Sequence, residues 1–233
     1  MYTTSPHVKR HIFALPEGQL FATRDLLSYG PRHAVDKALQ RLVKAGWIMR
    51  LARGIFMKTI DAKTEHMLPT VAQIAAIKAA AFGKQLFIHG KNAASHLKLG
   101  LFDNDEPTFL VTGYSSCFCC KAKEGKMVRV HFRSSNAVAS KLGDSKLGLI
   151  MRGIRQVGKE KLEPLILEKA TRGLNRPERQ KWRESIKWMP KWMTDLYWRL
   201  MRPTKTAMEQ PRVSVRPASG TACKRDFFEW QPR

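Results

Sequence analysis

Hydrophobic positions at the start of the chain follow helical spacing and then switch to the alternation of strands. Apolar residues predict a first helix from Pro6 to Leu15, which Pro16-Glu17-Gly18 ends. A short second helix is expected from Thr23 to Leu27, and Thr23 is suited to its N-cap. Ser28-Tyr29-Gly30 supplies the turn into a third helix.

The third helix is predicted from Pro31 to about Ala45, because its apolar residues recur at three- and four-residue spacing. Trp47 to Leu51 and Ile55 to Lys58 then predict paired strands, with Ala52-Arg53-Gly54 as the hairpin tip. Helices followed by a hairpin are the layout of a winged helix-turn-helix. In that fold one helix enters the DNA major groove and the hairpin lies beside it.

The rest of the chain mixes helices with strands and becomes helical toward its end. We predict an α+β protein with a winged helix-turn-helix domain at residues 1–60, a mixed α/β domain ending in a helical bundle at 65–202, and a flexible basic tail at 203–233. A linker is expected from Thr59 to Leu68. The other predicted elements are strands at Leu86–His89, Thr108–Thr112 and Met127–Phe132, and helices at Pro69–Gly83, Asn92–Leu97, Leu147–Val157, Lys161–Arg172, Pro177–Trp188 and Pro190–Met201.

The net charge of the chain says more about its expected partner than its hydrophobic content does. It has 42 Lys and Arg against 19 Asp and Glu, a formal net charge of +23. Such an excess repels itself unless a polyanion neutralises it, so nucleic acid is the expected partner. A membrane surface is disfavoured, because the sequence has no amphipathic Lys-rich anchor and no long apolar run. We expect a cytoplasmic protein, because residues 1–10 lack the apolar core of a signal peptide.

The candidate DNA contacts lie on the predicted third helix and around it. Arginine forks match the O6 and N7 atoms of guanine and glutamine matches adenine, whereas lysines, Thr23 and Arg24 suit phosphates. Arg53 at the hairpin tip is expected either in a minor groove or on a phosphate. The residues predicted to contact DNA are Thr23, Arg24, Arg32, His33, Lys37, Gln40, Arg41, Lys44, Arg50 and Arg53.

Other chemistry is weakly signalled, and we expect neither catalysis nor a bound metal or other cofactor. Cys117, Cys119 and Cys120 contain one Cys-x-x-Cys spacing, but a zinc site usually needs a second close pair. We interpret these cysteines as small apolar residues in a hairpin. The C-terminal tryptophans are interpreted as core rather than as a platform on which bases stack; they are Trp182, Trp188, Trp192 and Trp198.

Several blocks of residues match one known family when they are taken in order. The first is Ala38-Leu39-Gln40-Arg41-Leu42-Val43-Lys44-Ala45-Gly46-Trp47-Ile48, followed by Ala52-Arg53-Gly54-Ile55-Phe56. The second is His89-Gly90-Lys91-Asn92-Ala93-Ala94, followed by Leu99-Gly100-Leu101, Pro107 and Leu110-Val111-Thr112-Gly113. With Pro190-Lys191-Trp192-Met193 near its end, the chain resembles AbiEi-type antitoxins of type IV toxin–antitoxin systems. It departs from their pattern at Ala52 and Phe56, where glycine and tyrosine are usual.

The resemblance implies a winged helix that represses its own operon, joined to a domain that counters a partner toxin. The toxin would be a nucleotidyltransferase-like protein encoded beside it, in a system of the phage-defence type. We therefore expect a DNA-binding transcriptional repressor that autoregulates its promoter and acts as an antitoxin.

Other functions remain open from the sequence. A nucleic-acid-binding protein of a mobile element would lack the toxin partner, and an adaptor would use the winged helix to bind proteins. A nuclease would need carboxylates such as Glu124, Asp103 and Asp105 to hold Mg²⁺, but Glu124 falls in a charged turn that contains glycine. A monomer that reads two repeats and a homodimer on a palindrome also remain alternatives.

Overall fold

The structure is a computed structural model that describes residues 4–59, 68–99, 106–121, 125–135, 141–162 and 164–201. The predicted tail, most of the predicted linker and the carboxylates of Asp103, Asp105 and Glu124 lie outside these residues. The described residues form a mixed fold of helices and strands, as predicted. Among them, no helix is both long and apolar enough to cross a membrane.

The N-terminal part follows the predicted order of helices and hairpin strands, but it adds a strand at Leu20–Ala22, which the sequence does not predict, and differs in the second helix and its cap. It forms α1 (Thr4–Ala14), β1 (Leu20–Ala22), η1 (Thr23–Tyr29), α2 (Arg32–Lys44), β2 (Ile48–Ala52) and β3 (Ile55–Lys58). The predicted second helix is the 3₁₀ helix η1, and Ala22 rather than Thr23 occupies its N-cap. The Ala22 amide donates to Asp25 Oδ2 over 2.9 Å, so the cap is made by the carboxylate inside the helix.

The later elements agree with the predicted helices and strands to within a few residues. Helix starts are well marked in the sequence: Thr70 Oγ1 and Asn175 Oδ1 each accept from the amide three residues on, over 3.3 and 2.9 Å. The elements are α3 (Val71–Ala81), β4 (Leu86–Ile88), α4 (Gly90–His96), β5 (Thr108–Val111), β6 (Ser116–Lys121), β7 (Met127–Ser134), α6 (Lys146–Val157), α7 (Pro164–Arg172), α8 (Arg176–Ser185), η4 (Ile186–Trp188) and α9 (Lys191–Met201).

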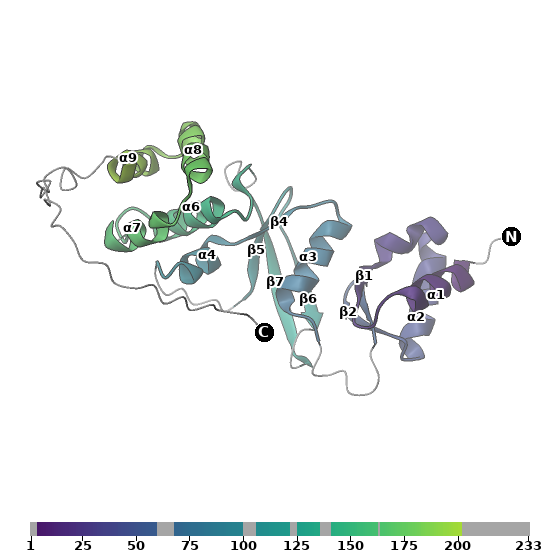
Figure 1. Ribbon diagram of the computed structural model, residues 1–233. Coiled ribbons are helices and arrows are strands. Elements are labelled where there is room, and N and C mark those ends of the chain that lie inside the picture. The colour runs from purple at the N-terminus through teal and green to yellow at the C-terminus, as the bar shows by residue number, and fades with distance from the viewer. Residues whose placement is uncertain are drawn as a thin grey trace, which may run out of the picture.

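All the strands of the described residues join one sheet of seven, in the order β1-β3-β2-β6-β7-β5-β4 (Figure 1). Neighbouring strands are antiparallel except β5 and β7, which run parallel. Two strands near the N-terminal end, β2 and β3, form the predicted hairpin. Figure 1 shows α1 and α2 at one end of the molecule and α6–α9 at the other, with the sheet and α3 between them.

The central core lies between α3 and one face of the sheet. Ile74, Ala75 and Ala79 of α3 are buried against strand residues that range from Ala22 in β1 to Phe132 in β7. Because α3 contacts both β1 and β4, which are the two edge strands, the sheet curls around this helix. We call the face toward α3 the inner face and the opposite face the outer face.

Two further cores lie outside this curl. Val8 and Ile12 of α1 pack with α2 residues and with Phe56, which points outward between the inward Ile55 and Met57. Helices α6–α9 bury a second apolar layer around Trp182, together with part of α4. The helices near the N-terminus therefore cover the outer face over β1–β3, and a separate helical layer occupies the far end.

Several contacts cross the predicted boundary between the two domains. Ala52 of β2 pairs with Cys120 of β6, which joins the hairpin to the central sheet. The Arg24 guanidinium donates to the Ala81 carbonyl at the end of α3 over 3.0 Å. Lys78 Nζ donates to the Arg53 carbonyl over 2.6 Å. The division into two domains stays a prediction. The inner face of the hairpin is buried by residues that follow it in the chain.

This shared core predicts that a cavity in α3 loosens the hairpin. We expect Ile74→Ala to lower the free energy of unfolding by about 2–5 kcal/mol, because Ile74 is fully buried. Hydrogen exchange should become faster in β2–β3 as well as in β5–β7. The control is Ala76→Ser on the exposed side of α3, which should change stability by less than about 1 kcal/mol. Faster exchange that spared the hairpin would show instead that the N-terminal part is stable alone.

Candidate nucleic-acid interface

Helix α2 has one apolar face and one polar face. Its apolar residues Val35, Ala38, Leu39 and Leu42 are buried against α1 and η1. Pro31 stands before the helix with φ −63° and ψ 148°, so the helix begins at Arg32, one residue later than predicted. Because the apolar stripe occupies one side, the polar residues between its members must face solvent.

The exposed residues of α2 divide into a central set and two flanks. With about 100° of rotation per residue, Gln40, His33 and Lys37 lie opposite the buried stripe. Arg32 lies on the flank toward the hairpin, and Arg41 lies on the other flank. All of these side chains belong to exposed residues. The helix therefore presents a polar ridge that is cationic on both sides.

The β2–β3 hairpin lies beside α2, and its strand geometry directs one arginine outward. The pairing register shifts between Arg50 and Ala52, and Leu51 and Ala52 are both buried. Such a bulge turns two successive residues toward the core and re-aims the side chain before them. Arg50 is consequently exposed, on the same outer face as Phe56, its partner in the register.

The hairpin tip is fixed by backbone contacts on two sides. Gly54 has φ 76°, a left-handed conformation that glycine adopts without strain. The Thr23 amide donates to the Gly54 carbonyl over 3.0 Å, and Lys78 holds the Arg53 carbonyl. The Arg53 side chain is left exposed at a tip whose backbone is held in place.

A hollow of about 370 Å³ separates α2 from the hairpin. Residues four apart along α2 form one wall, and the hairpin forms the other. Of the residues predicted to contact DNA, the structure brings Thr23, Arg32, Gln40, Lys44, Arg50 and Arg53 together here. The remaining lining residues are Asp36, Val43, Gly54 and Phe56.

Two predicted contact residues are partly engaged by the protein itself. Thr23 is 3% exposed at the base of the hollow, and its hydroxyl has no hydrogen-bond partner among the described residues. The Arg24 guanidinium is exposed, donates to the Ala81 carbonyl and lies 5.2 Å from the ring centre of Phe82. Phosphate contacts by these two residues stay a prediction.

Most of the positive charge in the hollow has no acidic partner. Arg32 Nε pairs with Asp36 Oδ2 at 3.0 Å, one turn further along the helix. Within the described part of the chain, Lys44, Arg50 and Arg53 form no ion pair. Unpaired cations around a concave surface concentrate positive potential there.

Lys78 is a further cation at this site that sequence reasoning missed. It lies on α3, beyond the predicted linker, and no local pattern places it near the hairpin. Burial lowers the pKa of Lys78, and the charges of Arg53, Arg32 and Arg50 lower it further. The same repulsion that disfavours its charge would be relieved by an anion in the hollow.

The cysteine segment forms a strand of a hairpin, as predicted. β6 pairs with β7, and strand alternation leaves Cys117 and Cys119 exposed on the outer face while Cys120 is buried on the inner face. Cys117 and Cys120, which make the Cys-x-x-Cys spacing, thus point to opposite faces. Among the residues that the structure describes, no cluster of three or more His, Cys, Asp or Glu is placed to hold a metal ion.

The C-terminal tryptophans fit the core interpretation only in part. Trp182 is buried and Trp192 is half-buried against the same core. Trp188 and Trp198 are 40% and 49% exposed. Lys141 and Lys187 approach the Trp188 ring to 3.7 and 4.5 Å from its centre, so this ring is shielded by cations.

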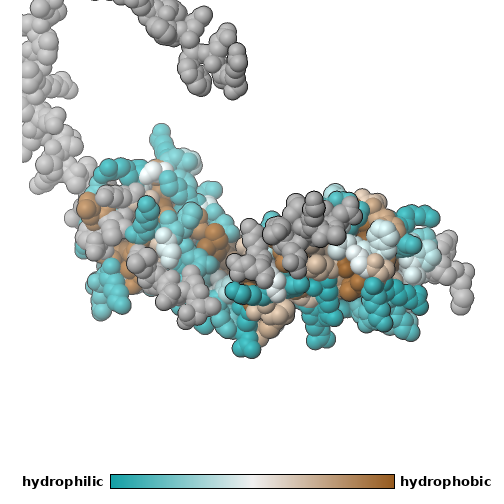
Figure 2. All heavy atoms as spheres, turned by 90° about the horizontal axis from the view of Figure 1, so that it is seen from below, coloured by the Kyte–Doolittle hydropathy of each residue, from teal (hydrophilic) through white to brown (hydrophobic). Residues whose placement is uncertain are grey.

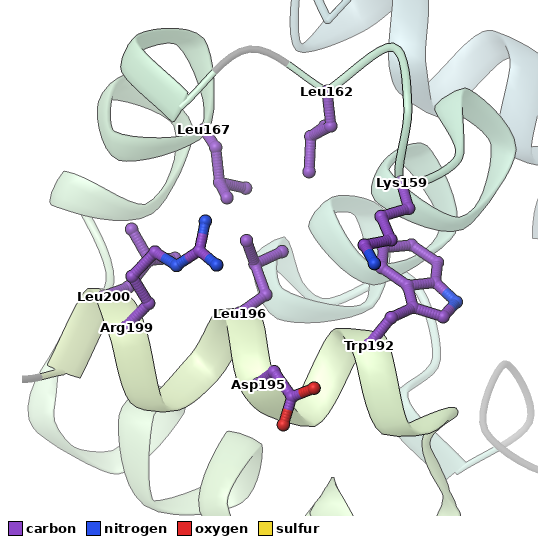
Figure 3. A pocket seen from close by; sticks show the side chains of 8 residues that line it. All are labelled: Lys159, Leu162, Leu167, Trp192, Asp195, Leu196, Arg199 and Leu200. Carbon is purple, nitrogen blue, oxygen red and sulfur yellow. The ribbon is translucent and has the colours of Figure 1, made fainter.

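A second hollow, of about 200 Å³, lies in the helical layer beside α9 (Figure 3). Leu162, Leu167 and Leu196 point toward one another there, whereas Asp195 points away. The lining is apolar at its centre with cations at its edge, and it holds none of the predicted contact residues. Elsewhere hydrophilic side chains cover much of the surface, with smaller hydrophobic patches between them (Figure 2).

Comparison with known proteins identifies the family of the chain. No curated protein and no solved structure gave a match. One family model matches residues 7–181, which include α2, the hairpin and all the other strands. This match does not name AbiEi-type antitoxins, so that resemblance stays a prediction. The chain belongs to the DUF6088 family, a family of unknown function.

Proposed function

We propose that the chain is a transcriptional repressor that binds double-stranded DNA through a winged helix-turn-helix in its first sixty residues. Helix α2 enters the major groove, and the β2–β3 hairpin is the wing. The observation that carries the proposal is the hollow in which Arg32, Lys44, Arg50 and Arg53 converge from two elements. A polyanion is the ligand that such unpaired charge favours, in keeping with the net charge of +23.

The dimensions of α2 suit a major groove. The helix has 13 residues and is therefore about 20 Å long, while the groove of B-DNA is about 12 Å wide and admits one helix. Gln40, His33 and Lys37 face the base edges from the centre of the exposed side. The amide of Gln40 matches adenine N6 and N7.

The flanks of α2 hold the two phosphate strands that border the groove. Arg41 contacts the strand on one side. On the other side the second strand passes over the hollow, where Lys44, Arg50 and Arg53 surround its phosphates. Asp36 orients the Arg32 guanidinium through their ion pair. Phosphate contacts on both sides fix the helix in the groove, so that the central side chains are able to discriminate sequence.

The antitoxin role extends this proposal and is supported by the resemblance of the sequence to AbiEi-type antitoxins. In this extension the helical layer, or the sheet beside it, counters a nucleotidyltransferase-like toxin encoded next to the chain. The alternative is a DNA-binding protein of a mobile element that has no toxin partner. DNA binding is common to both, so the interface of α2 and the hairpin does not depend on this choice.

The first prediction tests the interface as a whole. Replacing Arg32, Lys37 and Arg41 together by Ala removes cations from the centre and both flanks of α2. We expect at least a hundredfold weaker binding of a duplex taken from upstream of the gene, measured by gel shift at about 150 mM salt. The charge-matched control replaces Arg155, Arg172 and Arg176, which are exposed in the helical layer. Equal binding by the triple variant and the native protein would refute the recognition role of α2.

The second prediction separates base readout from phosphate contact. We expect Gln40→Ala to reduce the preference for the upstream duplex over a scrambled duplex by about 1–3 kcal/mol, with little change in salt dependence. We expect Arg41→Gln to weaken both duplexes equally and to reduce the slope of log K against log salt by about 0.9. Fluorescence anisotropy over a salt series measures both. If Gln40→Ala changed the salt slope and Arg41→Gln changed the preference between duplexes, Gln40 would contact phosphate and Arg41 would read bases.

The third prediction concerns the antitoxin extension alone. If the neighbouring gene encodes a toxin, its expression alone should arrest growth, and co-expression of this chain should restore growth. The triple variant of α2 should still restore growth when both genes are driven from a foreign promoter, because repression is then not needed. A neighbour without toxicity would favour the mobile-element alternative and leave the DNA interface in place.

A further inference from the structure

The outer face of β6 and β7 is open to solvent, although the inner face of the same strands is core. Strand alternation places Phe118, Val130 and Phe132 on the inner face, packed toward α3. The intervening residues face outward, where Cys117 pairs with His131, Cys119 with Arg129 and Lys121 with Met127. We call this set the outer β6–β7 face; its residues are Cys117, Cys119, Lys121, Met127, Arg129, His131 and Arg133.

This surface begins where the hairpin ends. Ala52, the last residue of β2, pairs with Cys120 of β6, so the hairpin tip that begins at Arg53 lies next to β6. On β6, Cys119 pairs with Arg129 of β7. The hairpin tip at the edge of the hollow therefore adjoins the strand whose neighbour carries an exposed arginine.

The charge of the outer β6–β7 face is positive and largely uncompensated. Arg129 and Arg133 are exposed and form no ion pair within the described residues. The acid beside them, Glu106, is engaged by His131 Nε2. Cys117 and Cys119 are small side chains opposite His131 and Arg129. Uncompensated positive charge of this kind suits a chain of phosphates better than an apolar or basic ligand.

We propose that the outer β6–β7 face binds the sugar–phosphate backbone of the DNA beyond the segment held by α2 and the hairpin. The inference rests on the proposed function and extends its contact surface into the central sheet. It is carried by the pairing of the hairpin with β6 and of β6 with β7, which places Arg129 near the hairpin tip, and by the match between unpaired arginines and phosphate. Base contacts are not required here, so this surface adds affinity without adding sequence preference.

The experiment compares three charge-matched pairs of substitutions in the full chain. Arg129→Gln with Arg133→Gln alters the outer β6–β7 face, Lys37→Gln with Arg41→Gln alters α2, and Arg155→Gln with Arg176→Gln is the control in the helical layer. Anisotropy is measured with a 30-bp duplex (about 100 Å long) over a salt series. We expect the first pair to weaken binding about tenfold and to reduce the salt slope by about 1.8, whereas the control pair changes neither.

The outcomes separate this inference from the proposed function. Weaker binding by the α2 pair together with native binding by the sheet pair would overturn the inference and leave the proposed function standing. Native binding by both pairs, or no DNA binding by the native chain, would overturn both. If the sheet pair weakened binding of a 30-nucleotide RNA but not of the duplex, the face would belong to RNA and the inference would be wrong.

The native cysteines supply a second, independent readout. Cys117 and Cys119 are exposed thiols on the outer β6–β7 face, whereas Cys120 is buried, and burial raises the pKa of its thiol. We expect a saturating 30-bp duplex to slow alkylation of Cys117 and Cys119 by a maleimide at least fivefold, as followed by mass spectrometry of the peptides. Unchanged alkylation at saturating duplex would contradict contact with this face, whatever the affinities of the variants.

Discussion

The packing of α3 inside the curled sheet is the interaction on which the rest of the structure depends. Ile74, Ala75 and Ala79 are fully buried against strands from both halves of the sheet. The small side chains of Ala75 and Ala79 let the sheet approach the helix closely and curl, so that its two edge strands both reach α3. Without this helix, the inner faces of β2 and β3 would be apolar surface in water.

That arrangement is what makes the hairpin a rigid part of a binding surface. A two-stranded hairpin alone is marginally stable in water. Here β3 also pairs with β1, β2 reaches β6, and Lys78 and Thr23 hold the backbone of the tip. The cost of ordering Arg50 and Arg53 for a ligand is therefore confined largely to their side chains, because the backbone beneath them is already fixed.

The sequence predicts those features that local periodicity determines. Helix α2 follows from the spacing of Val35, Leu39 and Leu42, and the hairpin follows from alternation around a glycine that must take positive φ. Features that depend on pairing between distant segments do not leave a local pattern. β1 has three residues and becomes a strand because β3 lies beside it. Lys78 reaches the Arg53 carbonyl because α3 packs under the hairpin, although the two residues are 25 positions apart and no spacing rule connects them.

The protein contacts of Thr23 and Arg24 have the same physical origin. Each is a polar residue at the start of a helix, and sequence reasoning places such residues in solvent near the ligand. The residue that caps η1 is Asp25, which accepts from the Ala22 amide, so the Thr23 hydroxyl is free to turn inward and be buried. Arg24 then meets the carbonyl end of α3, where a cation is favoured by the exposed carbonyl groups.

The charge of the chain links its stability to its ligand. With 42 basic and 19 acidic side chains, internal ion pairs cannot neutralise the surface even if every acid were paired. Lys78 beside the hairpin tip shows the consequence on a small scale, because its pKa is lowered by burial and by three arginines. An anion bound in the hollow removes that repulsion only in the folded state. A ligand present at a hundred times its Kd would contribute about 2.7 kcal/mol to folding, so a polyanion that occupies this surface also stabilises the fold that presents it.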